Sequence, residues 1–123
     1  MEIESRVYLI LDKELEMPVG KAAVQVGHGM DKIYECIMDI EDNPELLARY
    51  YHWRRQGRKK VTLGVKNAAE LQKYKTKLLD AGYVVFEIID NGVNFFDGPT
   101  RTGLAVFPVL QAIPELKRLQ VFK

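Results

Sequence analysis

Three short apolar runs are separated by helical patterns along the chain, and this order most constrains the fold. The runs cover residues 6–11, 60–65 and 83–89 and are rich in the branched and aromatic residues that strands favour. Strands joined by helices run parallel, because each crossover returns the chain to the same end of the sheet. A fourth run, centred on residues 104–107, follows the third after a loop alone and can run antiparallel to it. We therefore expect an α/β fold: a single three-layer domain, with a mixed four-stranded sheet and helices on both faces.

Helical spacing and local stop signals set the expected helix boundaries. A first helix is predicted from about residue 21 to 40 and a second over residues 45–56, with Pro44 at its first position. A third follows the capping residue Asn67 and stops at Gly82. Residues 108–119 are expected to form a short last helix that is interrupted at Pro114.

Composition excludes several classes of protein. The 123 residues are 47% hydrophobic and 28% charged, as in an ordinary globular protein, and they contain no repeat or linker, so residues 1–123 are expected to form one domain. The single cysteine, Cys36, rules out an internal disulfide framework and a Cys/His zinc pattern. No apolar stretch approaches the roughly 20 residues that span a bilayer. Residues 1–5 are acidic and lack the features of a signal peptide, so we expect a cytoplasmic protein without membrane association.

The charges are unevenly distributed although the net charge is only +1. Residues 49–66 contain seven basic side chains, no acidic one and an aromatic run, Tyr50 to Trp53. We call this stretch the basic segment; its cations are Arg49, Arg54, Arg55, Arg58, Lys59, Lys60 and Lys66. Basic and aromatic residues in this mixture suit a polyanion that carries bases, such as a nucleic acid. A solvated helix end and loop explains the same pattern, and composition leaves both readings open.

Polar residues follow the carboxyl ends of the predicted parallel strands. Lys21 comes after the first strand, Asp90 directly follows the third, and Thr102 begins the fourth at the same edge. Open α/β sheets place their sites outside the carboxyl ends of their strands. We therefore predict a site at this edge, provided that the first strand lies beside the third and fourth.

Lys21, Gln25 and His28 fall within roughly 60° of one another on the first predicted helix. The apolar stripe lies opposite and consists of Ala23, Val26, Met30, Ile33 and Ile37. We therefore expect the three polar residues on the face turned away from the core. A lysine near a helix N-terminus opposes the helix dipole, which favours an anion or a developing oxyanion between Lys21 and the free N–H groups. An exposed, solvent-screened lysine is the alternative.

Three motifs carry a resemblance that extends over nearly the whole chain. The first motif consists of Gly20, Lys21, Ala22, Ala23, Gln25 and His28. The second consists of Trp53, Gly57 and the strand that runs from Lys60 to Lys66. The third runs from Asp90-Asn91-Gly92 to Thr100-Arg101-Thr102. Together they resemble the type-2 peptidyl-tRNA hydrolase family, whose fold is a mixed four-stranded sheet with helices on both faces.

The resemblance implies hydrolysis of the ester that joins a peptide to the 3′ end of tRNA. It implies no metal or organic cofactor, peptidyl-tRNA as the substrate, and a homodimer. By position, Lys21, Asp90 and Thr102 match residues that the family is thought to use in catalysis. The residues expected to bind the substrate are Gln25, His28, Asn94, Thr100, Arg101, Arg54, Arg55, Arg58 and Lys59.

The residue types suit attack by water, because nothing resembles a nucleophile–histidine–acid triad. Asp90 is expected to orient or deprotonate the water. Lys21 and helix N–H groups are expected to stabilise the oxyanion, and Thr102 is expected to hydrogen-bond the ester or hold the water.

Two departures from the family pattern keep other functions open. Asn94-Phe95 stands where the family usually has Thr-Gln, and Gly98-Pro99 reverses its Pro-Gly. A relative that binds RNA or protein without catalysis is therefore one alternative, and a hydrolase of smaller esters or amides is another. Phe95 and Phe96 are expected to stack on tRNA bases, to pack onto the sheet or to fill a dimer contact.

Overall fold

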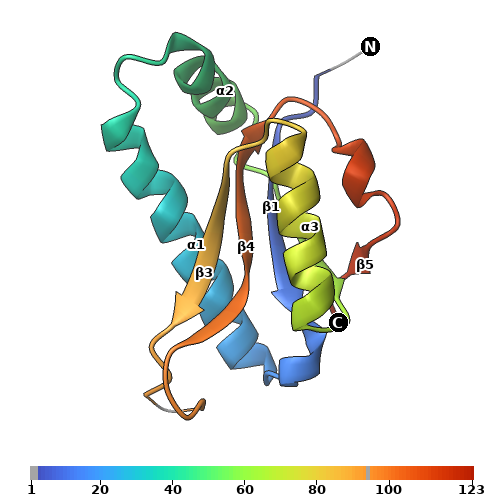
Figure 1. Ribbon diagram of the computed structural model, residues 1–123. Coiled ribbons are helices and arrows are strands. Elements are labelled where there is room, and N and C mark those ends of the chain that lie inside the picture. Colours follow the sequence, from blue (N-terminus) through green and yellow to red (C-terminus); the bar gives the residue numbers. More distant parts are fainter. Residues whose placement is uncertain (1–2, 94) are drawn as a thin grey trace.

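A mixed sheet forms the centre of the molecule in the computed structural model, which describes residues 3–93 and 95–123 (Figure 1). Its strands in the described residues are β1 (Arg6–Asp12), β2 (Lys60–Val65), β3 (Val85–Asp90), β4 (Thr100–Val109) and β5 (Gln120–Val121). Their order across the sheet is β3-β4-β1-β2-β5. β1 and β2 are parallel, β4 is antiparallel to both β1 and β3, and β5 is antiparallel to β2. The predicted directions of the first four strands are confirmed.

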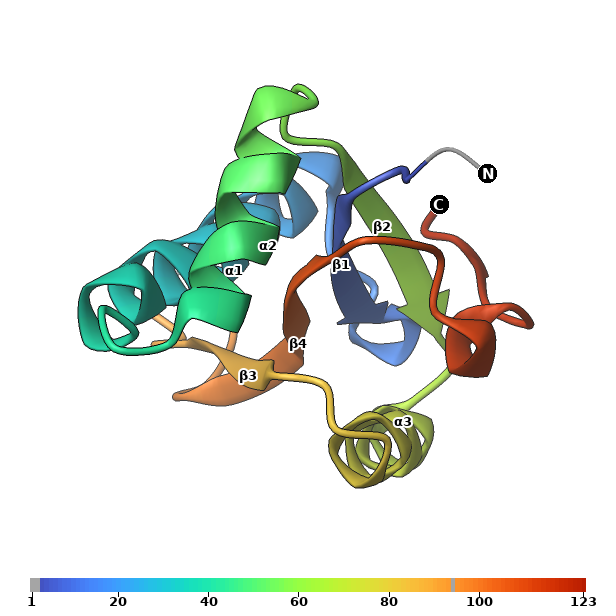
Figure 2. The ribbon, with the colours of Figure 1, turned by 90° about the horizontal axis from the view of Figure 1, so that it is seen from above.

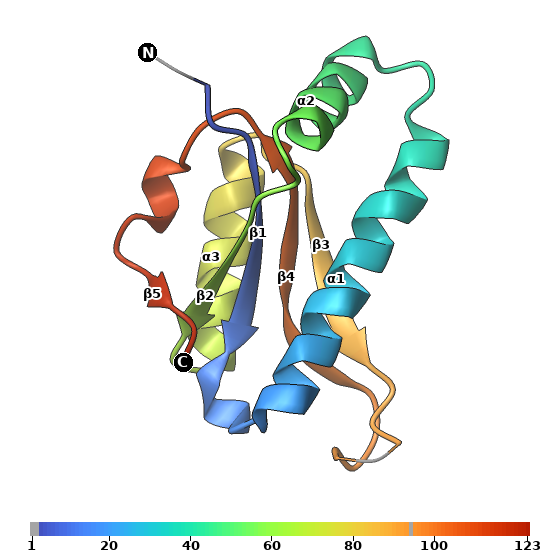
Figure 3. The ribbon, with the colours of Figure 1, turned by 180° about the vertical axis from the view of Figure 1, so that it is seen from behind.

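Helices cover both faces of the sheet, as expected for a three-layer domain. α1 (Val19–Asp39) and α2 (Pro44–Arg55) lie on one face, and α3 (Ala68–Asp80) lies on the other (Figures 2 and 3). Asn43 and Asn67 cap α2 and α3, because each side chain accepts a hydrogen bond from a free backbone N–H of the first turn. Short 3₁₀ turns, Lys13–Leu15 and Pro114–Leu116, follow β1 and β4.

Two apolar cores lie on the two sides of the sheet because alternate strand residues point to opposite faces. In β1, Leu9 and Leu11 face α1 and α2, whereas Tyr8 and Ile10 face α3. The first core also contains Trp53 of α2, which has no exposed surface. Among the described residues, no helix is both long and apolar enough to cross a membrane.

The predicted last helix over residues 108–119 is wrong. β4 continues to Val109, only Pro114–Leu116 form a 3₁₀ turn, and the two-residue strand β5 makes the sheet five-stranded rather than four-stranded. Proline is tolerated in β4 because the pairing with β1 shifts register between Arg6 and Tyr8, which leaves Pro108 beside a bulge. The α conformation is disfavoured at Ile113 because a proline follows it, and a longer helix does not form.

The expected orientation of the first helix is also wrong. Gln25 is completely buried and Ala23 is exposed, so α1 is rotated about its axis relative to the expected apolar stripe. Gly29 contributes to this packing, because a Cβ there would lie 2.8 Å from Leu9 Cδ1 and 3.0 Å from Ile88 Cδ1. α1 therefore approaches the sheet closely, with its polar residues directed at the sheet edge rather than away from it.

Candidate active site

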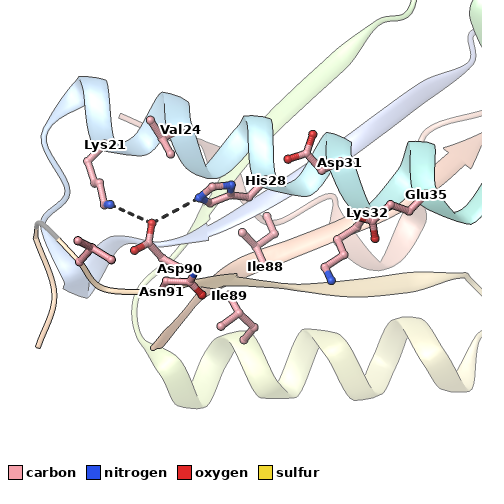
Figure 4. A pocket seen from close by; sticks show the side chains of 11 residues that line it. Lys21, Val24, His28, Asp31, Lys32, Glu35, Ile88, Ile89, Asp90 and Asn91 are labelled. Carbon is pink, nitrogen blue, oxygen red and sulfur yellow. Dashed lines mark ion pairs between the residues drawn. The ribbon is translucent and has the colours of Figure 1, made fainter. Parts of the chain in front are cut away.

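The strand order brings the predicted residues together. β4 lies between β3 and β1, so the carboxyl ends of β1 and β3 meet the start of β4 at one edge of the sheet. α1 begins at the same edge and places Lys21 and His28 over the end of β3 (Figure 4). Gln25, on the same helix, reaches Asp90 at the end of β3. The predicted convergence of Lys21, Asp90 and Thr102 at this edge is confirmed.

Asp90 is the centre of the cluster. Its Oδ2 atom lies 2.9 Å from Lys21 Nζ and accepts a hydrogen bond of 2.8 Å from Gln25 Nε2. His28 Nε2 lies 3.6 Å from the same oxygen, an ion-pair distance rather than a hydrogen bond (Figure 4). Oδ1 accepts a hydrogen bond of 2.8 Å from the backbone N–H of Gly92. The carboxylate is therefore held from α1 on one side and from its own loop on the other.

These contacts hold the pKa of Asp90 far below its usual range. The hydrogen bond from Gln25 contributes most; Lys21 and the Gly92 N–H add to it, and together they outweigh the opposing effect of burial. Asp90 is therefore ionised at neutral pH and is a weak base. It is suited to orienting other groups and poorly suited to removing a proton from water.

Gln25 connects Asp90 to Thr102 through a hydrogen-bond chain of fixed direction. Because a carboxylate only accepts, the Gln25 amide nitrogen faces Asp90, and its oxygen accepts a 2.8 Å hydrogen bond from Thr102 Oγ1. Gln25 and Thr102 both have no exposed surface. Thr102 therefore lies behind Gln25 and determines the orientation of its amide.

Lys21 is the cation that faces the open side of the cluster. Its side chain is 18% exposed and lies one turn from the start of α1. Pro18 occupies the N-cap, and among the described residues no side chain caps this helix, so its first N–H groups remain free. An ammonium and free N–H groups at one helix end favour a negative charge between them.

A groove of about 390 Å³ runs from this cluster along α1 and β3 (Figure 4). We call it the α1–β3 groove. It is lined by Lys21, Val24, His28, Asp31, Lys32, Glu35, Ile88, Ile89, Asp90, Asn91 and Val93. His28 and Asp90 lie at one end, and the charged side chains of Asp31, Lys32 and Glu35 continue along the helix. The cluster is therefore accessible from outside.

Phe95 and Phe96 border the same edge. Phe96 packs against the core beneath α1, and Lys21 Nζ lies 5.6 Å from the centre of its ring. Phe95 meets Phe96 edge-on at 4.9 Å between ring centres and remains 44% exposed. Phe96 thus packs onto the sheet layer, whereas Phe95 presents an aromatic surface. Asn94, a predicted binding residue, lies outside the described residues.

Glycines shape the loop that carries these side chains. Gly92 has a φ of +76°, and a Cβ there would collide with the carbonyl group of Gly98. Thr100 Oγ1 donates a hydrogen bond of 3.0 Å to the Gly98 carbonyl and takes no part in the Asp90 cluster. The two ends of the loop therefore lie against each other beside Asp90.

Arg101 does not join the site. It lies on the α3 face of β4, where its Nη1 is 2.8 Å from Glu87 Oε2 and 2.7 Å from Gln72 Oε1. Alternation along the strand places Arg101 and Thr102 on opposite faces of the sheet. The predicted substrate-binding role of Arg101 therefore lacks support from its position; its contacts connect α3 to β3 and β4.

The basic segment also lies away from the cluster. Arg54, Arg55, Arg58 and Lys59 are exposed at the end of α2 and in the turn before β2. This turn lies at the opposite end of the strands from the end of β3, which carries Asp90 (Figure 1). β4 runs between these two ends over ten residues, which corresponds to about 30 Å. Only an extended ligand can contact both regions.

The acid stability of the protein is predicted to depend on Asp90. Its pKa is depressed in the folded state, so the stabilisation is fully present above about pH 4 and is lost as the pH falls below this value. We expect the free energy of unfolding of wild type to fall more steeply than that of Asp90→Asn between about pH 5 and pH 2. Urea unfolding at several pH values measures this. A difference between the two proteins that stays constant over the range would contradict the assignment.

Comparison with known proteins identifies the family. The family model described as Peptidyl-tRNA hydrolase PTH2 matches residues 5–115. A peptidyl-tRNA hydrolase of Aeropyrum pernix is 32% identical over 100 residues, which cover 81% of this chain and 80% of that protein. One of Thermococcus onnurineus is 31% identical with the same coverage. A probable peptidyl-tRNA hydrolase 2 of Caenorhabditis elegans is 26% identical over 88% of this chain and 33% of that protein. The chain therefore belongs to the PTH2 peptidyl-tRNA hydrolase family.

Proposed function

We propose that this protein hydrolyses the ester bond between the peptide and the tRNA of peptidyl-tRNA, releasing free tRNA. The observation that carries the proposal is the Lys21–Asp90–Gln25–Thr102 cluster, joined by hydrogen bonds at the carboxyl ends of β1 and β3 in a chain that belongs to this family. The replaced loop residues favoured a non-catalytic relative, but the contacts that hold Asp90 in this cluster come from Lys21, Gln25 and Gly92.

Lys21 stabilises the tetrahedral oxyanion in this mechanism. One ammonium hydrogen points at Asp90 Oδ2, 2.9 Å away, which leaves two for the substrate. The free N–H groups at the start of α1 contribute further donors to the same charge. Asp90 holds the ammonium in place and stays ionised throughout.

His28 accepts the proton of the attacking water. The depressed pKa of Asp90 makes that carboxylate a poor base, so the proton needs another acceptor. His28 lines the groove, its side chain is 41% exposed, and its Nε2 faces Asp90. With a proton on Nε2, the imidazole leaves Nδ1 free to accept one from water. The ester then breaks, and His28 returns this proton to the tRNA 3′ oxygen as it leaves.

Thr102 is a positioning residue that acts through Gln25. Thr102→Val is expected to lower kcat about tenfold with little change in KM, because it leaves the buried Gln25 oxygen without its donor. Thr102→Ser keeps the hydroxyl and is expected to restore most of the rate. Steady-state kinetics on both variants measures this. Equal losses in the two variants would show that packing, rather than the hydrogen bond, matters.

The basic segment binds the tRNA backbone away from the ester. Replacing Arg54 and Arg55 together by alanine is expected to weaken tRNA binding and to reduce the slope of log Kd against log salt by about one to two, with kcat at saturation unchanged. The matched control replaces Lys73 and Lys77 on α3, which are also exposed. If both pairs change the slope equally, the basic segment has no specific role.

We further infer an RNA-binding protein of the cytoplasm that forms a homodimer. These inferences are supported by the family resemblance. Sedimentation equilibrium measures the oligomeric state.

The experiment that tests the function is deacylation of an N-acetyl-aminoacyl-tRNA by the purified protein. Wild type is expected to release free tRNA with multiple turnovers, and Lys21→Ala is expected to lose most of this rate. No release by wild type, with salt-sensitive tRNA binding intact, would indicate a binding module. Release from small esters without a preference for tRNA would indicate a general esterase.

A further inference from the structure

The α1–β3 groove extends well beyond the Asp90 cluster. Its α1 side chains lie on one face of the helix and run from Lys21 to Glu35, a distance of fourteen positions. At 1.5 Å per residue, the helix side of the groove is about 21 Å long. The Lys21–Asp90 contact lies at one end of it (Figure 4). A ligand that reacts at Asp90 can therefore extend in one direction along the groove, toward Glu35.

The other wall of the groove is the free edge of the sheet. β3 is the terminal strand of the sheet and, among the described residues, pairs only with β4. Ile88 and Ile89 point to opposite faces of the sheet, yet both line the groove. Figure 4 shows Ile88 directed toward α1 and Ile89 away from it. The groove therefore follows the outer edge of β3 over its last three residues, where the backbone N–H and C=O groups have no strand partner within the described residues.

The charges of the groove disfavour RNA. Two lysines, Lys21 and Lys32, face three carboxylates, those of Asp31, Glu35 and Asp90. A chain of phosphates would meet repulsion here, whereas a peptide backbone carries no net charge. Among the described residues, no cation of the basic segment lines the groove. The groove thus suits the acyl side of the substrate better than the tRNA side.

We propose that the peptide of peptidyl-tRNA binds in the α1–β3 groove as an added strand parallel to β3. This inference rests on the proposed function. β3 runs toward Asp90 and the ester is at the peptide's carboxyl end, so the peptide runs in the same direction as β3. Its last residue lies at Lys21 and Asp90, and its earlier residues extend toward Glu35.

Strand addition explains how one site serves peptides of any sequence. Main-chain hydrogen bonds supply the affinity, and the side chains of the peptide alternate between the two sides of the added strand. Near the ester, Val24 and Ile89 are 46% and 43% exposed and offer apolar contacts on the two sides. At about 3.3 Å per residue, the groove accommodates roughly six peptide residues.

The first test varies acyl length on one tRNA. N-blocked substrates with one, two, four and six residues are compared by kcat/KM. We expect kcat/KM to rise about tenfold or more with length and to level off near six residues. Normal hydrolysis of the one-residue substrate with no gain at greater length would overturn this inference alone. Failure to hydrolyse any substrate would overturn the proposed function and this inference together.

The second test detects strand pairing itself. Only alternate residues of a strand exchange hydrogen bonds with a given neighbour, so single N-methyl groups along a four-residue acyl chain should have alternating effects. We expect about a fivefold loss of kcat/KM at every second position and little loss between them. Losses that are uniform, or absent at every position, would overturn the pairing.

The third test asks whether tRNA, rather than the peptide, occupies the groove. Lys32→Gln removes a groove cation, and Lys73→Gln removes an equally exposed cation on α3. We expect the two variants to bind deacylated tRNA with Kd values within about twofold of each other. A selective rise in Kd for Lys32→Gln, with a salt slope reduced by about one, would mean that tRNA occupies the groove and would overturn the proposal.

Discussion

Replacement of Asp90 by asparagine lowers kcat for an N-blocked aminoacyl-tRNA by about 10²- to 10³-fold and leaves the Kd for deacylated tRNA within about twofold. Asparagine keeps the size and shape of the side chain, and its single oxygen can still accept from the Gly92 N–H, but its amide nitrogen then faces the donors Gln25 Nε2 and Lys21 Nζ. The negative charge that holds Lys21 2.9 Å away and faces His28 is lost. Both groups then lose their orientation toward the ester, and the rate falls although the substrate still binds.

Single-turnover kinetics with saturating enzyme measures this effect on the chemical step. Asp80→Asn is the matched control, because Asp80 is an exposed carboxylate at the end of α3. We expect the control to retain the wild-type rate within about twofold. If Asp90→Asn retains more than about a tenth of the wild-type rate, Asp90 does not organise the reaction.

Replacement of Trp53 by alanine destabilises the fold by about 3–5 kcal/mol. Trp53 is completely buried at the end of α2, and its indole Nε1 donates a 2.8 Å hydrogen bond to the Lys59 carbonyl. Its ring lies 6.1 Å from that of Tyr50 and 6.4 Å from that of Tyr34. The substitution opens a cavity between α2 and the sheet and removes the donor of Lys59.

Urea unfolding measures the loss of stability, with Tyr51→Ala as the matched control. Tyr51 lies on the same helix and is 45% exposed, so its loss should cost less than about 1 kcal/mol. Under conditions where the Trp53→Ala variant stays folded, it should retain kcat within about twofold. Trp53 contacts Lys59 beside the start of β2, at the opposite end of the strands from Asp90. Similar losses of stability in the two variants would contradict the role given to Trp53.

Much of the fold follows from local patterns, which the chain displays clearly. The strand runs, the caps Asn43 and Asn67, and Pro44 at the start of α2 are signals carried by adjacent residues. The segment after β4 could not be read in this way. Pro108 is accommodated by a bulge that depends on the partner strand β1, and β5 is only two residues long.

The sequence predicted that Lys21, Asp90 and Thr102 meet at one place, but it did not predict the hydrogen bonds that connect them. The order of strands and helices was sufficient to bring Lys21, Asp90 and Thr102 to one edge. Hydrophobic spacing predicted Gln25 on the outer face of the helix, since a polar side chain is expected there. No sequence pattern shows that a buried amide finds hydrogen-bond partners on β3 and β4. Strand alternation could have separated Arg101 from Thr102 in advance, since adjacent strand residues point to opposite faces.

Some site features had weaker signals in the sequence. Asp31, Lys32 and Glu35 follow Lys21 and His28 at helical spacing, but only the position of β3 makes them one wall of a groove. The Asp-Asn-Gly turn signalled a loop, whereas the hydrogen bond from Gly92 back to Asp90 depends on the folded geometry. The depressed pKa of Asp90 depends on the same three-dimensional contacts and could not be inferred from residue types.

The chain of hydrogen bonds through Gln25 has a consequence for the order in which the protein assembles. Gln25 meets Asp90 across 65 positions of sequence and Thr102 across 77. Contacts between such distant segments form late in folding, because long loops must close first. During synthesis the helix that carries Lys21 is complete long before β4 exists. A chain that ends before Thr100 has the lysine and the carboxylate but cannot fix the Gln25 amide, so the site is completed only by the last fifth of the chain.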